Sequence, residues 1–143
     1  MTTAEQLTLV FNNNFVAYFR SHAAHANVTG RTFRSDHKML GGVYERRQAQ
    51  IDIIGELLRT MQEFMPFNLQ QVIEDATIPC DAIEGTADEL LEAVMMDLEH
   101  LLIDYRDLIT IASVEDLEEV SNYAQDQALD LEKSIWMLRS TLE

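Results

Sequence analysis

The sequence predicts an all-α protein, organised as one bundle of four long helices that spans residues 1–143. The chain contains only five glycines and two prolines, so few residues interrupt helical stretches. Apolar residues recur at intervals of three and four, and no stretch shows the valine and isoleucine alternation that is typical of strands. The length of 143 residues fits a single compact domain with a core of its own.

The first long helix is expected over residues 4–26, with Thr3 and Gln6 spaced as a capping box at its start. Gly30 can adopt the left-handed conformation, so the segment that contains it should end this helix. The second helix is expected over residues 36–65, where Pro66 would stop it. Its apolar positions form one stripe, with a gap at Arg47: Leu40, Val43, Tyr44, Ile51, Ile54, Leu58, Met61 and Met65.

The second half of the chain predicts two more long helices after a long connection. The connection covers residues 66–85, long enough to cross the bundle, and residues 68–75 favour a short extra helix inside it. The third helix is expected to begin at a capping box of Thr86 and Glu89 and to reach residue 111. The fourth is expected from after Ser113 to Leu142. We interpret the seven methionines and Trp136, which fall mainly on helical stripes, as core residues.

The net charge of −15 argues against binding to a polyphosphate backbone, since the chain has only two lysines, Lys38 and Lys133. An acidic surface favours solubility, or it concentrates cations; composition leaves both open. The single cysteine, Cys80, favours a reducing compartment such as the cytoplasm. No apolar run is long enough to span a membrane, and the N-terminus lacks the basic segment of a signal peptide.

Four residues could ligate a transition metal: His25, His37, Asp52 and Glu56. Asp52 and Glu56, four residues apart, share one helix face, although such a pair is more often merely solvated. His37 and Asp52 are fifteen residues apart on one expected helix, which separates them by roughly 22 Å. Either the histidines and the carboxylates are unrelated, or a second subunit with an antiparallel helix brings them together.

The stretch from His25 to Phe33, HANVTGRTF, followed by His37, resembles the Dps family of miniferritins within the ferritin-like superfamily. Asp52 and Glu56 follow at the family's spacing, and EKSIWML from residue 132 resembles its closing helix. The resemblance implies a ferritin-like four-helix bundle that assembles as a tetrahedral dodecamer. It implies inter-subunit ferroxidase sites, with His25 and His37 from one subunit and Asp52 and Glu56 from its neighbour. Such sites oxidise Fe(II), usually with hydrogen peroxide, and the shell stores Fe(III); zinc or manganese could substitute for iron.

The sequence departs from the Dps pattern at two positions near the histidines. Ala26 stands where a tryptophan is common, and Gly41 stands where the family often has an aspartate, so one iron position lacks a carboxylate. His22 shares a helix face with His25 and is either an additional ligand or a surface histidine. Asp97 and His100 are interpreted as an ordinary polar helix face, because the second helix lacks the histidine that an intrachain diiron site would need.

Acidic residues gather at the start of the fourth expected helix, where they suit the helix dipole. The resemblance places Glu118, Asn122 and Asp126 at the three-fold pores through which iron enters. Two other functions remain open: a DNA-compacting protein, disfavoured by the absence of a lysine-rich tail, and a cage that has lost its ferroxidase activity.

Overall fold

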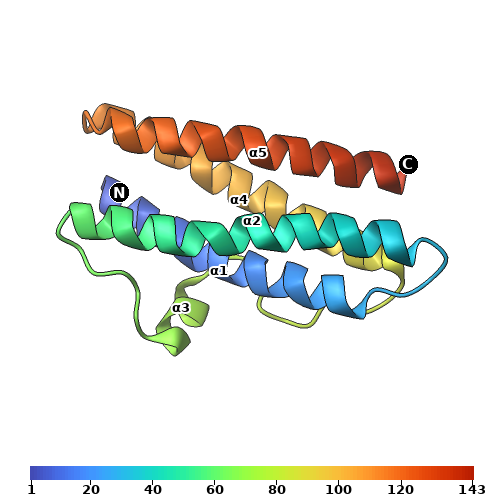
Figure 1. Cartoon of the computed structure of the whole chain (residues 1–143). Coiled ribbons are helices and arrows are strands. Elements are labelled where there is room, and N and C mark those ends of the chain that lie inside the picture. The colour runs from blue at the N-terminus through green and yellow to red at the C-terminus, as the bar shows by residue number, and fades with distance from the viewer.

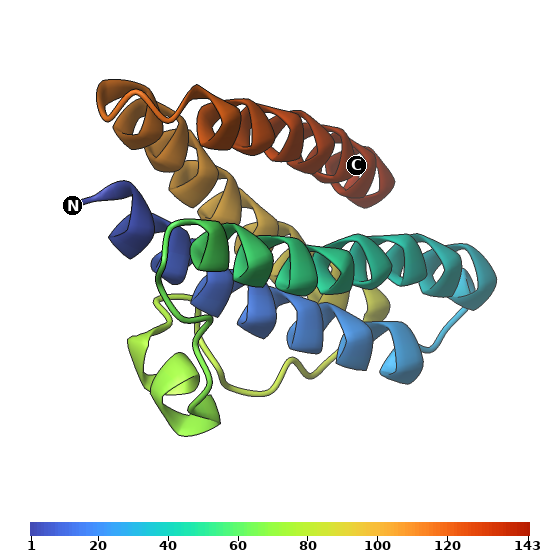
Figure 2. The same cartoon turned by 60° about the vertical axis from the view of Figure 1, so that its left-hand side comes forward.

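A computed structural model describes all 143 residues and confirms the all-α bundle (Figure 1). It contains five helices and no strand, in the following order: α1 Thr3–Asn27, α2 Phe33–Thr60, α3 Leu69–Asp75, α4 Ala87–Val114 and α5 Glu118–Leu142. α1 packs against α2 and α4, and α5 packs against α4. The short α3 lies beside α1, on the side away from α5, as the two views show (Figure 2).

The capping box of α1 was predicted one residue too late. Thr2 caps the helix, and its partner in the box is Glu5. Thr3 and Gln6 are both buried and serve tertiary contacts, since Thr3 donates to the Glu115 carboxylate and Gln6 donates to the Asp104 carbonyl at 2.9 Å. Spacing alone could not tell the cap from these contacts with α4 and the turn after it.

α2 ends at Thr60, so the prediction that it continues to Met65 and is stopped by Pro66 is wrong. The amide of Glu63 donates to the Leu58 carbonyl at 3.0 Å, and Gln62 takes a left-handed φ of 64°, which closes the helix end. The chain then folds back, so that the Met65 sulfur lies where a β-carbon on Gly55 would be only 2.6 Å away. Gly55 thus allows this close packing.

The other boundaries follow the prediction more closely. Asn68 caps α3, and Thr86 and Glu89 form the predicted capping box of α4. α4 extends to Val114, three residues beyond the prediction, so α5 begins at Glu118. None of the helices combines the length and the apolar character that crossing a bilayer requires.

The buried core consists of aliphatic residues with a few aromatic ones, and no methionine or tryptophan belongs to it. Met39, Met61 and Met95 are partly buried and pack against this core, so the interpretation as core residues is correct in part for them and wrong for Trp136 and the exposed methionines. Trp136 is 56% exposed and Met96 62% exposed. Met96 lies on the face of α4 opposite its buried residues, and Trp136 lies well away from the buried face of α5. Neither side chain therefore points into the core of one chain.

Arg47, which interrupts the apolar stripe of α2, is buried and forms an ion pair. The Arg47 side chain is only 2% exposed and donates to the Asp130 carboxylate of α5 at 2.7 Å. Its backbone carbonyl accepts from Asn14 of α1 at 2.7 Å. Nearby, the Tyr123 hydroxyl donates to Gln50 at 2.7 Å, which adds a second polar link between α5 and α2. Arg47 is thus part of the core despite its charge.

Asp97 does not lie on an ordinary polar face, contrary to the prediction. It is 5% exposed and accepts from the Arg20 guanidinium of α1 at 2.8 Å. Burial raises the pKa of the Asp97 carboxyl to about 6, although Arg20 opposes this shift. His100, half-buried, interacts with Thr77 at 2.8 Å and lies 3.9 Å from Asp104. These groups anchor the connection between α3 and α4.

Removing Asp130 should destabilise the bundle, because Asp130→Ala leaves the Arg47 charge buried without its partner. We expect a loss of about 3 kcal/mol. The double variant Arg47→Met/Asp130→Ala should recover most of it, since no buried charge remains. Thermal melts followed by circular dichroism, at one fixed protein concentration, measure the stability of the two variants. If the single and the double variant lose equal stability, the prediction is contradicted.

The Asp97 carboxyl should titrate near pH 6 in the folded protein. Because its folded pKa lies above the unfolded value of 3.8, folding favours the protonated form. Its contribution to the free energy of unfolding is therefore present at low pH and is lost as the pH rises through about 6. An infrared titration should show a carboxyl group that titrates near pH 6 and is absent in Asp97→Asn. It should persist in the matched control Asp81→Asn, which removes the exposed partner of the same Arg20. If the group that titrates near pH 6 is lost in both variants, its assignment to Asp97 is refuted.

Candidate metal centre

The turn between α1 and α2 sets the relative position of two histidines. Val28 caps α1 through its amide and is buried, and Gly30 follows with a φ of 118°. The Phe33 amide then donates to the Gly30 carbonyl at 3.2 Å as α2 begins. The Thr32 hydroxyl donates to the buried Asp36 carboxylate at 2.7 Å, which fixes the first turn of α2. The end of α1 and the start of α2 are thereby held side by side.

His25 and His37 form a reciprocal pair across this turn. The Nδ1 of His25 lies 2.7 Å from the His37 carbonyl, and the Nδ1 of His37 lies 2.7 Å from the His25 carbonyl. The rings stack with centroids 3.8 Å apart, and Phe33 stacks on the outer side of His37 at 5.0 Å. Because a carbonyl only accepts, both Nδ1 atoms carry hydrogen, and Nε2 of each neutral ring is left with a free lone pair. Two imidazoles fixed in this tautomer are well suited to bind a transition metal.

Gly41 explains how the His25 ring reaches this position. A β-carbon at Gly41 would lie 3.1 Å from Cε1 and 3.2 Å from Nδ1 of His25. The imidazole therefore packs directly on the backbone of α2. A side chain at position 41 would press on the His25 ring, so glycine leaves room for the ring at this position.

The structure does not bring Asp52 and Glu56 to the histidine pair within one chain. Both are exposed on one face of α2, in its C-terminal half, whereas His37 lies in its second turn. The helix continues without interruption, so the separation of roughly 22 Å along its axis holds. No group of three histidine, cysteine, aspartate or glutamate side chains in the chain is arranged to hold a metal ion.

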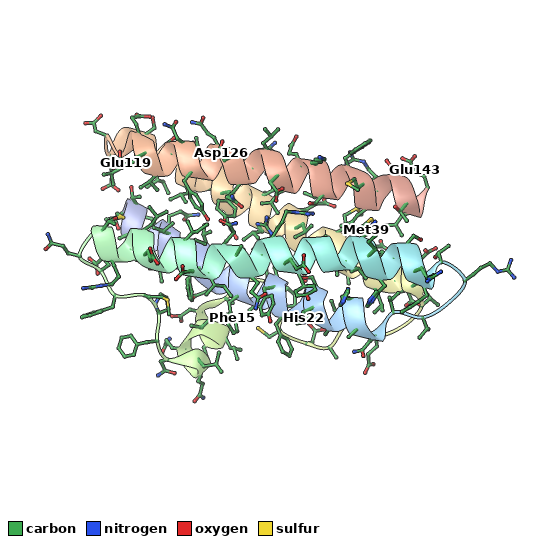
Figure 3. All side chains as sticks on the ribbon, viewed as in Figure 1. Phe15, His22, Met39, Glu119, Asp126 and Glu143 are labelled. Atoms are coloured by element: carbon green, nitrogen blue, oxygen red, sulfur yellow. The ribbon has the colours of Figure 1, made fainter.

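The predicted pore residues Glu118, Asn122 and Asp126 are all exposed in the first turns of α5. They follow one another at intervals of four, so they lie along one helix face. Glu118 accepts from the Ser113 hydroxyl at 3.0 Å. Figure 3 shows Asp126 on this half of α5, far from Glu143 at its other end. One chain thus presents a row of polar groups but no closed channel.

His22 and Tyr44 adjoin His25, and Tyr18 adjoins both of them; of the three, only His22 was considered as a possible ligand from the sequence. His22, which is labelled in Figure 3, stacks on Tyr44 of α2 with ring centroids 3.8 Å apart and planes 8° apart. Its Nδ1 lies 3.1 Å from the Tyr18 hydroxyl. Tyr44 in turn lies 5.0 Å from the His25 ring. The intervals of four and three from Tyr18 through His22 to His25 could have indicated this cluster.

Residues 4–143 match the family described as the ferritin-like domain. The DNA protection during starvation protein of Helicobacter pylori is 26% identical over 143 residues, which cover 99% of each chain. The crystal structure of Helicobacter cinaedi CAIP has a TM-score of 0.93 at 27% identity, covering 99% of this chain and 100% of that one.

A Dps protein from Vibrio cholerae O1, described as a member of a broad superfamily of ferritin-like diiron-carboxylate proteins, shares the fold. Its TM-score is 0.93 at 23% identity, over 99% of this chain and 89% of that one. The chain therefore belongs to the ferritin-like family, and its relatives within that family are Dps proteins.

Proposed function

We propose that this protein is a miniferritin that binds and oxidises Fe(II) and stores Fe(III) inside a shell of twelve subunits. The observation that carries the proposal is the His25–His37 pair, which is fixed in the metal-binding tautomer and yet lacks any carboxylate from its own chain. Asp52 and Glu56 are the complementary half, because they are exposed, lie on one face, and have no partner of their own. A two-fold axis with antiparallel α2 helices would join the two halves.

In this proposal each site draws two histidines from one subunit and two carboxylates from its neighbour. The imidazoles and carboxylates suit Fe(II), and zinc or manganese could occupy the same ligands. Hydrogen peroxide takes one electron from each of two Fe(II) ions and, with two protons, leaves two Fe(III) ions and two waters. Oxidation of iron without hydroxyl radical would protect the cell against oxidative damage. Glu118, Asn122 and Asp126 would line the entry pores, where carboxylates attract the incoming cations.

Duplex DNA is not among the partners that we propose. The chain carries ten lysines and arginines against 25 acidic residues. Several of the cations are already paired within the fold: Arg20 with Asp97 and Asp81, Arg46 and Arg47 with Asp130, and Arg106 with Glu132. Too few remain to offset the repulsion between an acidic shell and phosphates. The reducing cytoplasm is the compartment that the single exposed cysteine favours.

The shared site can be tested by mixing two inactive variants. One chain lacks both histidines (His25→Ala, His37→Ala), and the other lacks both carboxylates (Asp52→Ala, Glu56→Ala). In a mixed two-fold pair, one site receives both intact halves, so random reassembly should restore roughly a quarter of the sites. Iron oxidation is measured after native mass spectrometry has shown twelve-subunit mixed shells. Mixed shells without any recovery would refute the shared site, and a persistent monomer would refute the shell.

Gly41→Ala should weaken metal binding, because its β-carbon meets the His25 ring at 3.1 Å and pushes it from its hydrogen bond with His37. Loss of an orienting contact of this kind typically lowers metal affinity about 10-fold or more. Calorimetric titration with Zn(II) measures the change. The matched control is Gly42→Ala on the same helix, whose β-carbon meets only the flexible end of Arg46. Equal affinity in the two variants would show that the His25 position is not critical.

A further inference from the structure

Tyr18 and His22 form a hydrogen-bonded phenol–imidazole pair beside the metal-binding histidines. The Tyr18 hydroxyl and Nδ1 of His22 are 3.1 Å apart, one helical turn from each other on α1. Both side chains are half-buried between α1 and α2. A phenol that loses an electron becomes strongly acidic, so a base in hydrogen-bond contact makes this oxidation easier. An imidazole that carries hydrogen on Nε2 provides that base through Nδ1.

A continuous series of rings connects this pair to His25. His22 lies face to face with Tyr44 at 3.8 Å, Tyr44 lies 5.0 Å from His25, and His22 lies 6.2 Å from His25. Tyr18 is 6.3 Å from Tyr44. Phe33 packs on His37 and is not part of this series. Tyr18 is therefore linked to the proposed metal ligand His25 only through neighbouring rings.

Gly41 gives such an electron donor a role at the proposed ferroxidase site. Gly41 offers no side-chain ligand, and the His25 ring packs against its backbone, so under the proposed function we infer a site that holds one Fe(II) at a time. A single bound Fe(II) supplies one electron, whereas reduction of hydrogen peroxide to water requires two. If the second electron is missing, the product is hydroxide and a hydroxyl radical. A nearby phenol can supply that electron before the radical escapes.

We propose that Tyr18 is a redox-active residue that donates the second electron to hydrogen peroxide and passes its phenolic proton to His22. This inference rests on the proposed ferroxidase function. Fe(II), peroxide, the Tyr18 phenol and two protons from solvent give Fe(III), two waters, the Tyr18 phenoxyl radical and protonated His22. A second Fe(II) then reduces the radical, and His22 returns the proton to Tyr18. In total, two Fe(II) ions are oxidised for each hydrogen peroxide, although the site needs to bind only one Fe(II) ion at a time.

The other hydrogen-bonded tyrosines of the bundle are poor candidates for this step. The hydroxyls of Tyr105 and Tyr123 lie 3.3 Å apart, and Tyr123 donates to the Gln50 amide oxygen at 2.7 Å. Burial raises the pKa of both phenols, which means that their ionised forms are disfavoured. An amide oxygen does not accept a proton as an imidazole does. Tyr123 therefore provides a matched control, a hydrogen-bonded tyrosine of the same chain without a base.

The test uses electron paramagnetic resonance. The assembled protein receives less than one Fe(II) ion per site, then hydrogen peroxide, and is freeze-quenched. We expect a tyrosyl radical in the wild type and in Tyr123→Phe, and its loss in Tyr18→Phe. His22→Gln should also lose it, because the proton acceptor is gone. A spin trap should capture more hydroxyl radical from Tyr18→Phe than from wild type. A radical that survives in Tyr18→Phe, or that disappears only in Tyr123→Phe, would overturn the proposal.

A second measurement separates this inference from the proposed function. A photochemical one-electron oxidant, applied to the iron-free assembled protein, should generate the radical on Tyr18 in preference to the other tyrosines, and His22→Gln should remove that preference. This result does not depend on iron oxidation. If iron is not oxidised but Tyr18 is still the preferred site of photo-oxidation, the ferroxidase function fails while the redox pair stands. If iron is oxidised but photo-oxidation shows no preference for Tyr18, the redox pair fails alone.

Discussion

The buried ion pair between Arg47 and Asp130 is the constraint on which the arrangement of the bundle depends. A guanidinium that is 2% exposed must keep its partner, so α2 and α5 are fixed in one register where they otherwise make few contacts. The hairpins α1–α2 and α4–α5 are thereby joined at their open side. Packing against α1 and this ion pair together orient α2, so that His37 lies beside α1 and the Asp52–Glu56 face is exposed. The two halves of the proposed metal centre take their directions from these contacts.

Helix length then imposes a second condition on the site. α2 is straight enough to hold its histidine and its carboxylates far apart, and no intrachain group of three ligands exists. The proposed site can therefore form only where two subunits meet, and not within one folded chain. The chain prepares each half separately: hydrogen bonds select the tautomer of the histidines, and helix periodicity aligns the carboxylates. Assembly would complete the site with little rearrangement of either half.

The sequence was sufficient to predict elements that local rules control. The short helix in the connection, the capping box at Thr86 and the break at Gly30 depend on neighbouring residues, and the structure confirms them. The predictions were wrong where a contact distant in sequence decided the outcome. Thr3 donates its hydroxyl to Glu115 and does not cap the helix, and Asp97 is buried because it pairs with Arg20. The pairing of His25 with His37 was expected from the family resemblance, but the reciprocal bonds and the Tyr18–His22 contact depend on the angle at which α1 crosses α2. No one-dimensional pattern contains that angle.

The exposed apolar side chains of the folded chain have a consequence for how the protein is maintained in a cell. Trp136 and Met96 were placed in the core by periodicity, and Phe67, at 85% exposed, joins them on the surface. A free subunit with such a surface would associate with other apolar surfaces, whereas in the proposed shell a neighbouring copy would cover it. Folding and association would then be linked by mass action. The rate of synthesis, which sets the subunit concentration, would decide how much protein escapes degradation before it is assembled.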